Sequence, residues 1–322
     1  MATSEQIKAL IRSYYNDNDD QFLTSALQIA AHEAKQGHGA LAHEIRDLID
    51  KGRQATSTLK GSLVFPQDLN GLIFSVEPEL ALSSLVVSPK LKQRIERIVF
   101  EFKQQAKLKS HGLCHRRKIL LAGPPGTGKT MTAKVLAADL HQLLHIIQMD
   151  RLVTKFMGET SAKLRQIFDK MREMPGVYLF DEFDAIGNER NAENDVGEIR
   201  RVLNSFLQFI ENDTSNNLII AVTNNPRLLD RALFRRFDDV LHYELPLLDE
   251  RAALIANLLG TFRGKDFDVS KAAKMADGLS QADIDRVCRD VIKMTILDNK
   301  NVVAFSLFGE LLKERLAAYI AK

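Results

Sequence analysis

The chain has 322 residues, 45% of them hydrophobic and 27% charged, which excludes an intrinsically disordered protein. A formal net charge of +2 provides no overall field that would attract nucleic acid or an anionic membrane, so neither is expected as a partner. The two cysteines, Cys114 and Cys288, lie outside any CxxC pattern and no apolar run approaches the ~20 residues of a membrane span, so we expect a cytoplasmic protein.

The N-terminal part of the chain has a helical pattern. Apolar residues recur at helical spacing around residues 7–11, 22–30 and 41–49, with polar or Gly-rich interruptions between them. This predicts a small helical bundle over residues 1–55, which we interpret as a recruiting domain. Residues 56–84 contain scattered Gly, Pro and Asn-Gly and are predicted to form an irregular connector.

Residues 85–246 alternate short apolar runs with helical patterns, beginning with a helix over 90–107. This alternation predicts right-handed βαβ units, and therefore an α/β domain with a parallel sheet and flanking helices. The predicted strands are Lys118–Ala122, Leu144–Met149, Val177–Phe180, Leu218–Val222 and Val240–Tyr243. Residues 247–322 contain four helical stretches and no strand pattern, so a separate all-α domain is expected there.

A glycine-rich stretch between the first predicted strand and the helix after it fits GxxxxGK[ST]. In this context the pattern predicts a P-loop, whose backbone N–H groups and helix N-terminus bind the phosphates of ATP. The lysine would neutralise the β/γ-phosphates, and the threonine would bind Mg²⁺. An accidental glycine-rich turn is the alternative. The residues are Gly123, Pro124, Pro125, Gly126, Thr127, Gly128, Lys129 and Thr130.

The predicted strand over 177–180 ends in two carboxylates, Asp181 and Glu182. Ligands bind at the carboxyl edge of open α/β sheets, so this strand end is expected beside the P-loop. Asp181 would hold Mg²⁺ directly or through water, and Glu182 would orient and deprotonate the attacking water. A solvated strand end is the alternative.

Three motifs in this order resemble the P-loop, Walker B and second region of homology of AAA-clade AAA+ ATPases. They are residues 123–130, Asp181-Glu182-Phe183-Asp184, and the stretch 221–238, and the resemblance covers Leu85 to Lys322. It implies an AAA+ large domain over 85–246, a lid domain over 247–322, and a ring, usually a hexamer, with ATP between neighbouring subunits. The compact layout is similar to that of stand-alone bacterial AAA ATPases.

The resemblance also implies roles for residues outside the two nucleotide motifs. Asn224 matches sensor 1, which places the attacking water; a strand-end Asn that caps a turn is the alternative. Arg235 and Arg236 match the arginine-finger region, adjacent as in the katanin and spastin branch, and which of them acts is left open. A solvated arginine pair is the alternative reading.

The segment 152–160 resembles the first pore loop of the family, in which an aromatic residue grips an extended polypeptide. Phe156, flanked by Lys155 and Met157, would be the grip; the alternative is an ordinary core aromatic. A second pore loop is a weaker expectation over 187–197. The segment 278–284 resembles the lid's G-x-S-G-A-D motif with Gln281 in place of a small residue, and is expected near the nucleotide. Val86 and Val87 could line the adenine pocket; ordinary core packing is the alternative.

These features favour ATP hydrolysis that drives unfolding or threading of a protein substrate. The chain has no HExxH, GxSxG or other protease pattern, so degradation would require a separate protease subunit. The alternatives are an ATP-dependent assembly switch, for which Phe156 would be dispensable, and a nucleic-acid motor, which the low net charge disfavours. The spacing of His141 and His145 could suit zinc only if both lay on one helix, which the pattern argues against.

Overall fold

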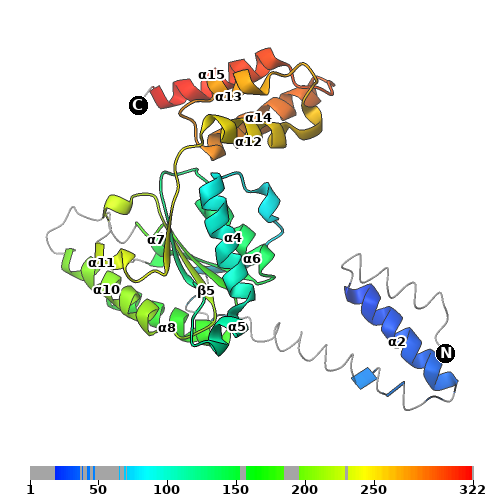
Figure 1. Cartoon of the computed structure of the whole chain (residues 1–322), viewed down its shortest axis with the longest axis vertical. Helices are drawn as coiled ribbons and strands as arrows, with labels where there is room; N and C mark the ends of the chain where they lie inside the picture. Colours follow the sequence, from blue (N-terminus) through cyan, green and yellow to red (C-terminus); the bar gives the residue numbers. More distant parts are fainter. Residues whose placement is uncertain are drawn as a thin grey trace. The chain divides into compact units, whose positions relative to one another are not determined.

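The computed structural model describes residues 19–36, 38, 42–43, 46–47, 65, 69, 71–152, 157–184, 196–228 and 231–320 (Figure 1). The chain divides into two compact units, Met1–Val64 and Phe65–Lys322. In the first unit, helix α2 (Asp19–Lys35) buries Ala26 and Ala30, in agreement with the second predicted helical stretch. The stretch predicted at 7–11 lies outside the described residues, and that at 41–49 is described only in part.

The second unit is built on a six-stranded sheet of order β1-β3-β4-β5-β2-β6. Pairing is parallel from β3 to β6, and β1 alone joins antiparallel, at the edge beside β3. The predicted parallel α/β sheet is therefore confirmed. The strands are β1 (Ile73–Val76), β2 (Lys118–Ala122), β3 (Leu144–Gln148), β4 (Val177–Asp181), β5 (Leu218–Thr223) and β6 (Asp239–His242).

The prediction of an irregular segment over residues 56–84 was wrong for part of its length. Strand β1 lies in it, with Ile73 paired to Ile147 and Val76 to Leu144, and a 3-10 turn, η2, follows at Leu82–Ser84. Four residues are too few for a clear alternation of apolar and polar side chains. The strand forms because the open edge of β3 supplies its hydrogen-bond partners.

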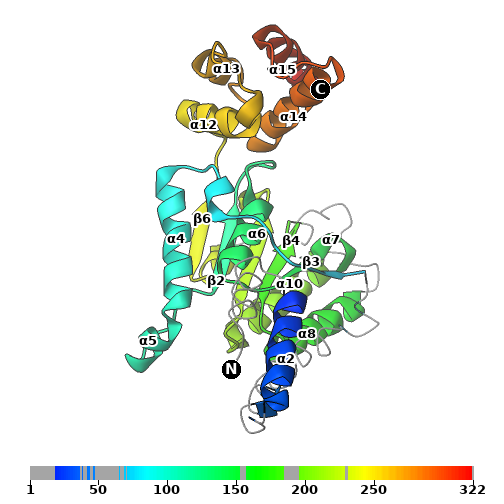
Figure 2. The same cartoon turned by 90° about the vertical axis from the view of Figure 1, so that its right-hand side faces the viewer.

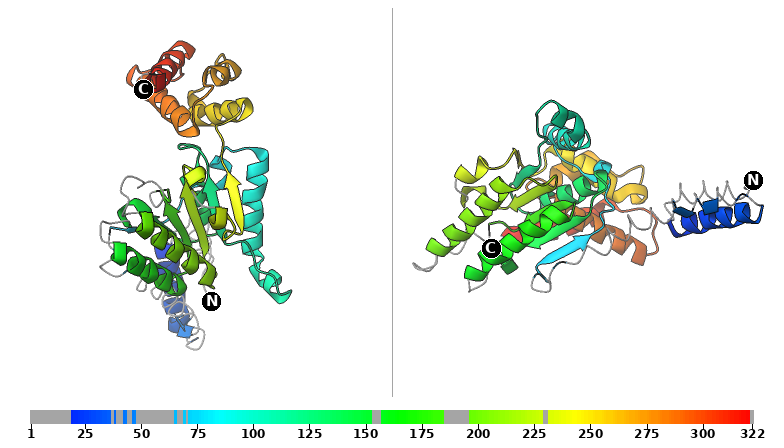
Figure 3. Two further views of the ribbon diagram at one scale, coloured as in Figure 1. Left: turned by 90° about the vertical axis from the view of Figure 1, so that its left-hand side faces the viewer. Right: turned by 90° about the horizontal axis from the view of Figure 1, so that it is seen from below.

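Helices cover both faces of the sheet (Figures 2 and 3). Helices α4 and α6 lie on one face, where Val177 and Leu179 of β4 join their apolar side chains. Helices α8 and α10 lie on the other, where Phe180 of the same strand contacts Phe168 and Phe206. The helices of this part are α4 (Pro89–Lys103), α5 (Gln105–Ser110), α6 (Lys129–Asp139), α7 (Met149–Leu152), α8 (Met157–Glu173), α10 (Val196–Asn212) and α11 (Arg231–Phe234), with the 3-10 turn η3 at Pro226–Leu228.

Phe206 lies at the centre of the aromatic layer between β4 and α10 and has no exposed surface. The centroid of its ring lies 4.6 Å from that of Phe183 and 5.0 Å from that of Phe180. We expect Phe206→Ala to lower the free energy of unfolding by about 3–5 kcal/mol because it leaves a cavity in this layer. Phe100→Ala is the matched control, since Phe100 is 66% exposed and its removal should change stability by less than about 0.5 kcal/mol. Denaturant unfolding compares the two; equal losses would contradict the assignment of this layer as core.

The C-terminal helices form a lid with its own apolar core, which includes Ile255, Ile284 and Phe308. Ser280 and Asp283 form a capping box at the start of the third lid helix, and Arg315 of the last helix contacts the same aspartate. The lid helices are α12 (Leu248–Leu259), α13 (Val269–Met275), α14 (Gln281–Leu297) and α15 (Phe305–Ile320), with the 3-10 turn η4 at Gly260–Phe262. Within the described part of the chain, none of the helices is long and apolar enough to cross a bilayer.

Candidate active site

The glycine-rich turn leaves the buried strand β2 and enters α6. Gly126 and Gly128 have φ of 76° and 92°, in the left-handed region that glycine adopts without strain. A Cβ on Gly126 would lie 2.5 Å from Oγ of Ser280 in the lid, and one on Gly123 would overlap the carbonyl of Tyr243. The turn therefore has the close backbone packing of a P-loop, and it touches the lid directly.

Lys129 is the first residue of α6, and its side chain is buried, with 4% of the residue exposed. Its Nζ donates to the carbonyl oxygens of Gly123 and Pro124, at 2.8 and 2.6 Å. Burial lowers the pKa of Lys129 to about 8, and the negative charges of Asp181 and Asp184 oppose this shift. A buried ammonium within the turn supplies the cation that a phosphate ligand requires.

Strand β4 places Asp181 beside the start of α6. Thr130 Oγ1 donates to Asp181 Oδ2 at 3.2 Å, so these two oxygens, far apart in the sequence, lie together. Oxygen ligands of this kind suit Mg²⁺, which needs only one or two protein ligands when phosphate oxygens and water complete its shell. The residues present therefore fit a magnesium ion.

Glu182 follows in an unusual backbone conformation. Its φ is 55°, which is rare for a residue other than glycine, and its N–H donates to Asp181 Oδ1 at 3.0 Å. Burial, followed by the nearby charges of Asp150, Asp181 and Asp184, raises the pKa of Glu182. A carboxylate with a raised pKa is a better proton acceptor, as a general base requires.

Asn224 lies just after β5, the strand between β4 and β2. Its backbone N–H donates to Asp184 Oδ1 at 3.2 Å, which ties the end of β5 to the segment after β4. Neither Asp184 nor Asp150 has a role predicted from the sequence. The only signal for Asp184 was its place in the acidic motif, and Asp150 had none, since it lies after β3 and approaches Glu182 only in the folded chain.

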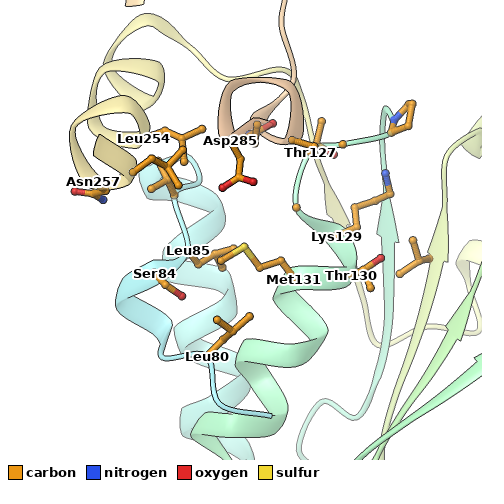
Figure 4. A pocket seen from close by; sticks show the side chains of 18 of the residues that line it. Leu80, Ser84, Leu85, Thr127, Lys129, Thr130, Met131, Leu254, Asn257 and Asp285 are labelled. Atoms are coloured by element: carbon orange, nitrogen blue, oxygen red, sulfur yellow. The ribbon is translucent and has the colours of Figure 1, made fainter. Parts of the chain in front are cut away.

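Lys129, Thr130, Asp181, Glu182 and Asn224 line a cavity of about 990 Å³, a size suited to a nucleotide (Figure 4). The predicted site residues Gly123 and Pro124, at the start of the turn, are not part of its lining. The lid contributes to it, as expected for the segment 278–284, and Val86 also lines it. At this junction Ala282 N donates to Gly126 O at 2.9 Å. The lining comprises Leu80, Ser83, Ser84, Leu85, Val86, Pro125, Gly126, Thr127, Gly128, Lys129, Thr130, Met131, Asp181, Glu182, Val222, Asn224, Leu254, Asn257, Leu258, Gln281, Ala282, Asp285 and Arg289.

The remaining predicted site residues lie elsewhere. Arg235 and Arg236 are exposed and do not line this cavity of their own chain; Arg236 NH1 lies 2.5 Å from Glu211 Oε1 of α10. Lys155, Phe156 and most of the segment 187–197 lie outside the described residues, and Met157 is described only as the first residue of α8.

Two other sequence patterns have structural explanations. His145 lies in β3, fully buried, with Nδ1 2.8 Å from Ser75 Oγ, and burial lowers its pKa to about 4. His141 lies beyond the end of α6, and within the described ranges no three His, Cys, Asp or Glu side chains could hold a metal together. The second pattern is the basic stretch 115–118. Arg116 pairs with Glu101, and Arg117 pairs with Asp213, so these two arginines have acidic partners within the chain.

A parallel sheet with a P-loop between β2 and α6, an acidic strand end at β4 and a helical lid define a P-loop nucleoside triphosphatase. Residues 119–245 match the model of the ATPase family associated with various cellular activities (AAA). The chain is 35% identical over 321 residues to an uncharacterised AAA family ATPase, y4kL, of Sinorhizobium fredii, covering 98% of this chain and 96% of that protein. The chain therefore belongs to the AAA family of ATPases and hydrolyses ATP.

Two further relatives match the ATPase part. A putative cell division cycle ATPase of Plasmodium falciparum is 36% identical over 188 residues, which cover 56% of this chain and 15% of that protein. A putative 26S proteasome regulatory subunit homologue of Methanothermobacter marburgensis is 32% identical over 204 residues, which cover 62% of this chain and 55% of that protein.

Proposed function

We propose that this ATPase works as a ring, with six subunits, that unfolds or threads a protein substrate. The observation that carries the proposal is the direct contact of lid and P-loop, where Ala282 N donates to Gly126 O. Because this bond joins the lid to the loop that would bind phosphates, we expect the position of the lid to respond to the nucleotide. Such a coupling is what converts hydrolysis into movement.

The site residues divide the work of hydrolysis among them. The P-loop backbone of residues 123–128 holds the phosphates, and Lys129 moves its ammonium from the carbonyls of the loop to the β/γ-phosphates. Thr130 and Asp181 hold Mg²⁺, which, when bound, neutralises charge on the phosphate oxygens. Glu182 takes a proton from the attacking water, and Asn224 positions that water from the end of β5.

The exposed arginines complete the site of a neighbouring subunit. Arg235 or Arg236 would approach the γ-phosphate held by the next copy and stabilise the charge that develops there. Because Arg236 is paired with Glu211 on α10, that carboxylate would orient it or release it as the ring assembles. The adjacent arginine pair would fit the katanin and spastin branch of the family.

The parts outside the ATPase core would supply specificity. The predicted division has a recruiting domain over 1–55, a connector over 56–84, the large domain over 85–246 and the lid over 247–322. Phe156, with Lys155 and Met157, would grip the substrate in the central pore. The similarity to a putative 26S proteasome regulatory subunit homologue supports a link to proteolysis, so a separate protease subunit is a candidate partner.

We expect Phe156→Ala to abolish substrate capture while leaving basal ATPase activity within about twofold, because a residue that grips the substrate in the pore would not contact the nucleotide. Both forms would carry Glu182→Gln, be loaded with ATP, and be recovered from host lysate for mass spectrometry. Phe100→Ala, which removes an exposed aromatic from α4, is the control.

Proteins held by the Phe100→Ala form and lost from the Phe156→Ala form would support threading and identify the substrate. If the same proteins remain bound without the Phe156 ring, the pore does not grip them, and an ATP-dependent assembly switch becomes the better account.

A further inference from the structure

The nucleotide cavity contains two charged side chains that the roles above leave unused. Asp285 and Arg289 lie on α14, and both line the cavity. Arg289 Nε donates to Asp285 Oδ2 at 2.7 Å, one helical turn apart. The helix contacts the P-loop at Ala282, which precedes both residues. The carboxylate of Asp285 therefore lies about one helical turn beyond this contact.

The two ends of the cavity differ in chemistry. The P-loop, with Lys129 and Thr130, forms the end that suits phosphates. Apolar side chains line the part away from Lys129, which suits the face of a base: they are Leu80, Leu85 and Leu254 (Figure 4). Figure 4 shows Asp285 between Leu254 and Thr127, that is, between the two ends. A nucleotide with its phosphates on the P-loop and its base on the apolar wall has its ribose in this middle part.

A carboxylate at this position can only accept hydrogen bonds, and the ribose hydroxyls are donors. Arg289 occupies one oxygen of Asp285, which leaves the second to face a ligand. The adenine edge is a poorer partner, because its ring nitrogen N1 is an acceptor beside the donor amino group. The side chain of Asp285 is 35% exposed and that of Arg289 is 67% exposed, so the arginine supports the carboxylate from the solvent side.

We propose that Asp285 binds a ribose hydroxyl of ATP and makes this enzyme select ribonucleotides over deoxyribonucleotides, with Arg289 as its positioning residue. The inference rests on the proposed assignment of this cavity as the ATP site. Neither residue takes part in the hydrolysis chemistry, so the effect belongs to nucleotide binding.

The test compares dissociation constants for ATP, 2′-dATP, 3′-dATP and GTP, measured by calorimetry in the Glu182→Gln background. We expect the parent protein to bind ATP about tenfold more tightly than at least one deoxy analogue, as for one hydrogen bond to a charged group. Asp285→Ala should weaken ATP about tenfold and that analogue less than twofold, so that the preference disappears. Asp285→Asn keeps the shape of the side chain and should lower the preference to an intermediate value.

Two matched variants complete the design. Arg289→Ala should reduce the preference partly, since it only orients the carboxylate. Asp290→Asn, which alters a neighbouring aspartate paired with Lys293 outside the cavity, should leave all four constants unchanged.

Three results would overturn the proposal: a parent protein that binds ATP and both deoxy analogues equally, a loss in Asp285→Ala that is equal for all of them, or a change confined to the ratio of ATP to GTP. The last would show that the carboxylate contacts the base edge. If the cavity is not the ATP site, the result is different: Lys129→Met would bind ATP as tightly as the parent protein.

Discussion

Glu182→Gln is expected to bind ATP as tightly as the parent protein while lowering kcat by at least about 100-fold, the usual contribution of a general base. The amide keeps the size of the side chain but cannot take the proton of the attacking water. The pKa of Glu182 is raised by burial and by Asp150, Asp181 and Asp184, which strengthens it as a base. Steady-state phosphate release and nucleotide binding by calorimetry measure the two quantities separately.

The control for this substitution is Glu173→Gln, at the end of α8, where the carboxylate is 64% exposed and pairs with Lys170. It should leave kcat unchanged. A Glu182→Gln enzyme that retains more than a third of the parent kcat would contradict the assignment, and the neighbouring carboxylates Asp150 and Asp184 would become the candidates for the base.

Lys129→Met is expected to weaken ATP binding about 100- to 1,000-fold, because it removes a buried cation that would make charged hydrogen bonds to the β/γ-phosphates. Methionine keeps the apolar stem, so the fold should survive. Lys134→Met on the same helix, outside the cavity, is the control and should bind normally. Calorimetry in the Glu182→Gln background measures binding without turnover.

The same lysine predicts a pH dependence. Burial lowers the pKa of Lys129 to about 8, and bound phosphates would raise it again because they favour the charged form. Titration of Lys129 should therefore leave the affinity for ATP nearly constant below pH 8. Above pH 8 the affinity should fall by up to about tenfold per pH unit. A Lys129→Met protein that shows the same decline would mean that another group titrates.

Much of the fold could be predicted from the sequence because its signals are local. The apolar runs before and after the helical patterns placed β2 to β6 within a residue or two of their observed bounds, and the glycine-rich turn predicted the P-loop. The acidic pair after Phe180 predicted that the end of this strand lies beside the P-loop, since the carboxyl ends of parallel strands share one edge of the sheet.

Other features could not be predicted, because they depend on residues that are distant in sequence. Strand β1 is too short to have a periodicity and forms on the open edge of β3. The approach of Asp150 to Glu182 likewise depends on the order of strands in the sheet. Phe156 lies outside the described residues, so the pore loop stays a prediction from sequence.

The sequence by itself determined that the chain is a P-loop ATPase with a helical lid, because the spacing of glycines, lysine and carboxylates is dictated by phosphate and magnesium chemistry. Only the tertiary structure decided how the site is closed. It placed Ala282 against Gly126 and set Asp285 between the phosphate and base ends of the cavity. The physical reason is that a helix such as α14 has its own periodicity in the sequence. The face that it presents to the P-loop, which lies far earlier in the chain, is fixed only by packing.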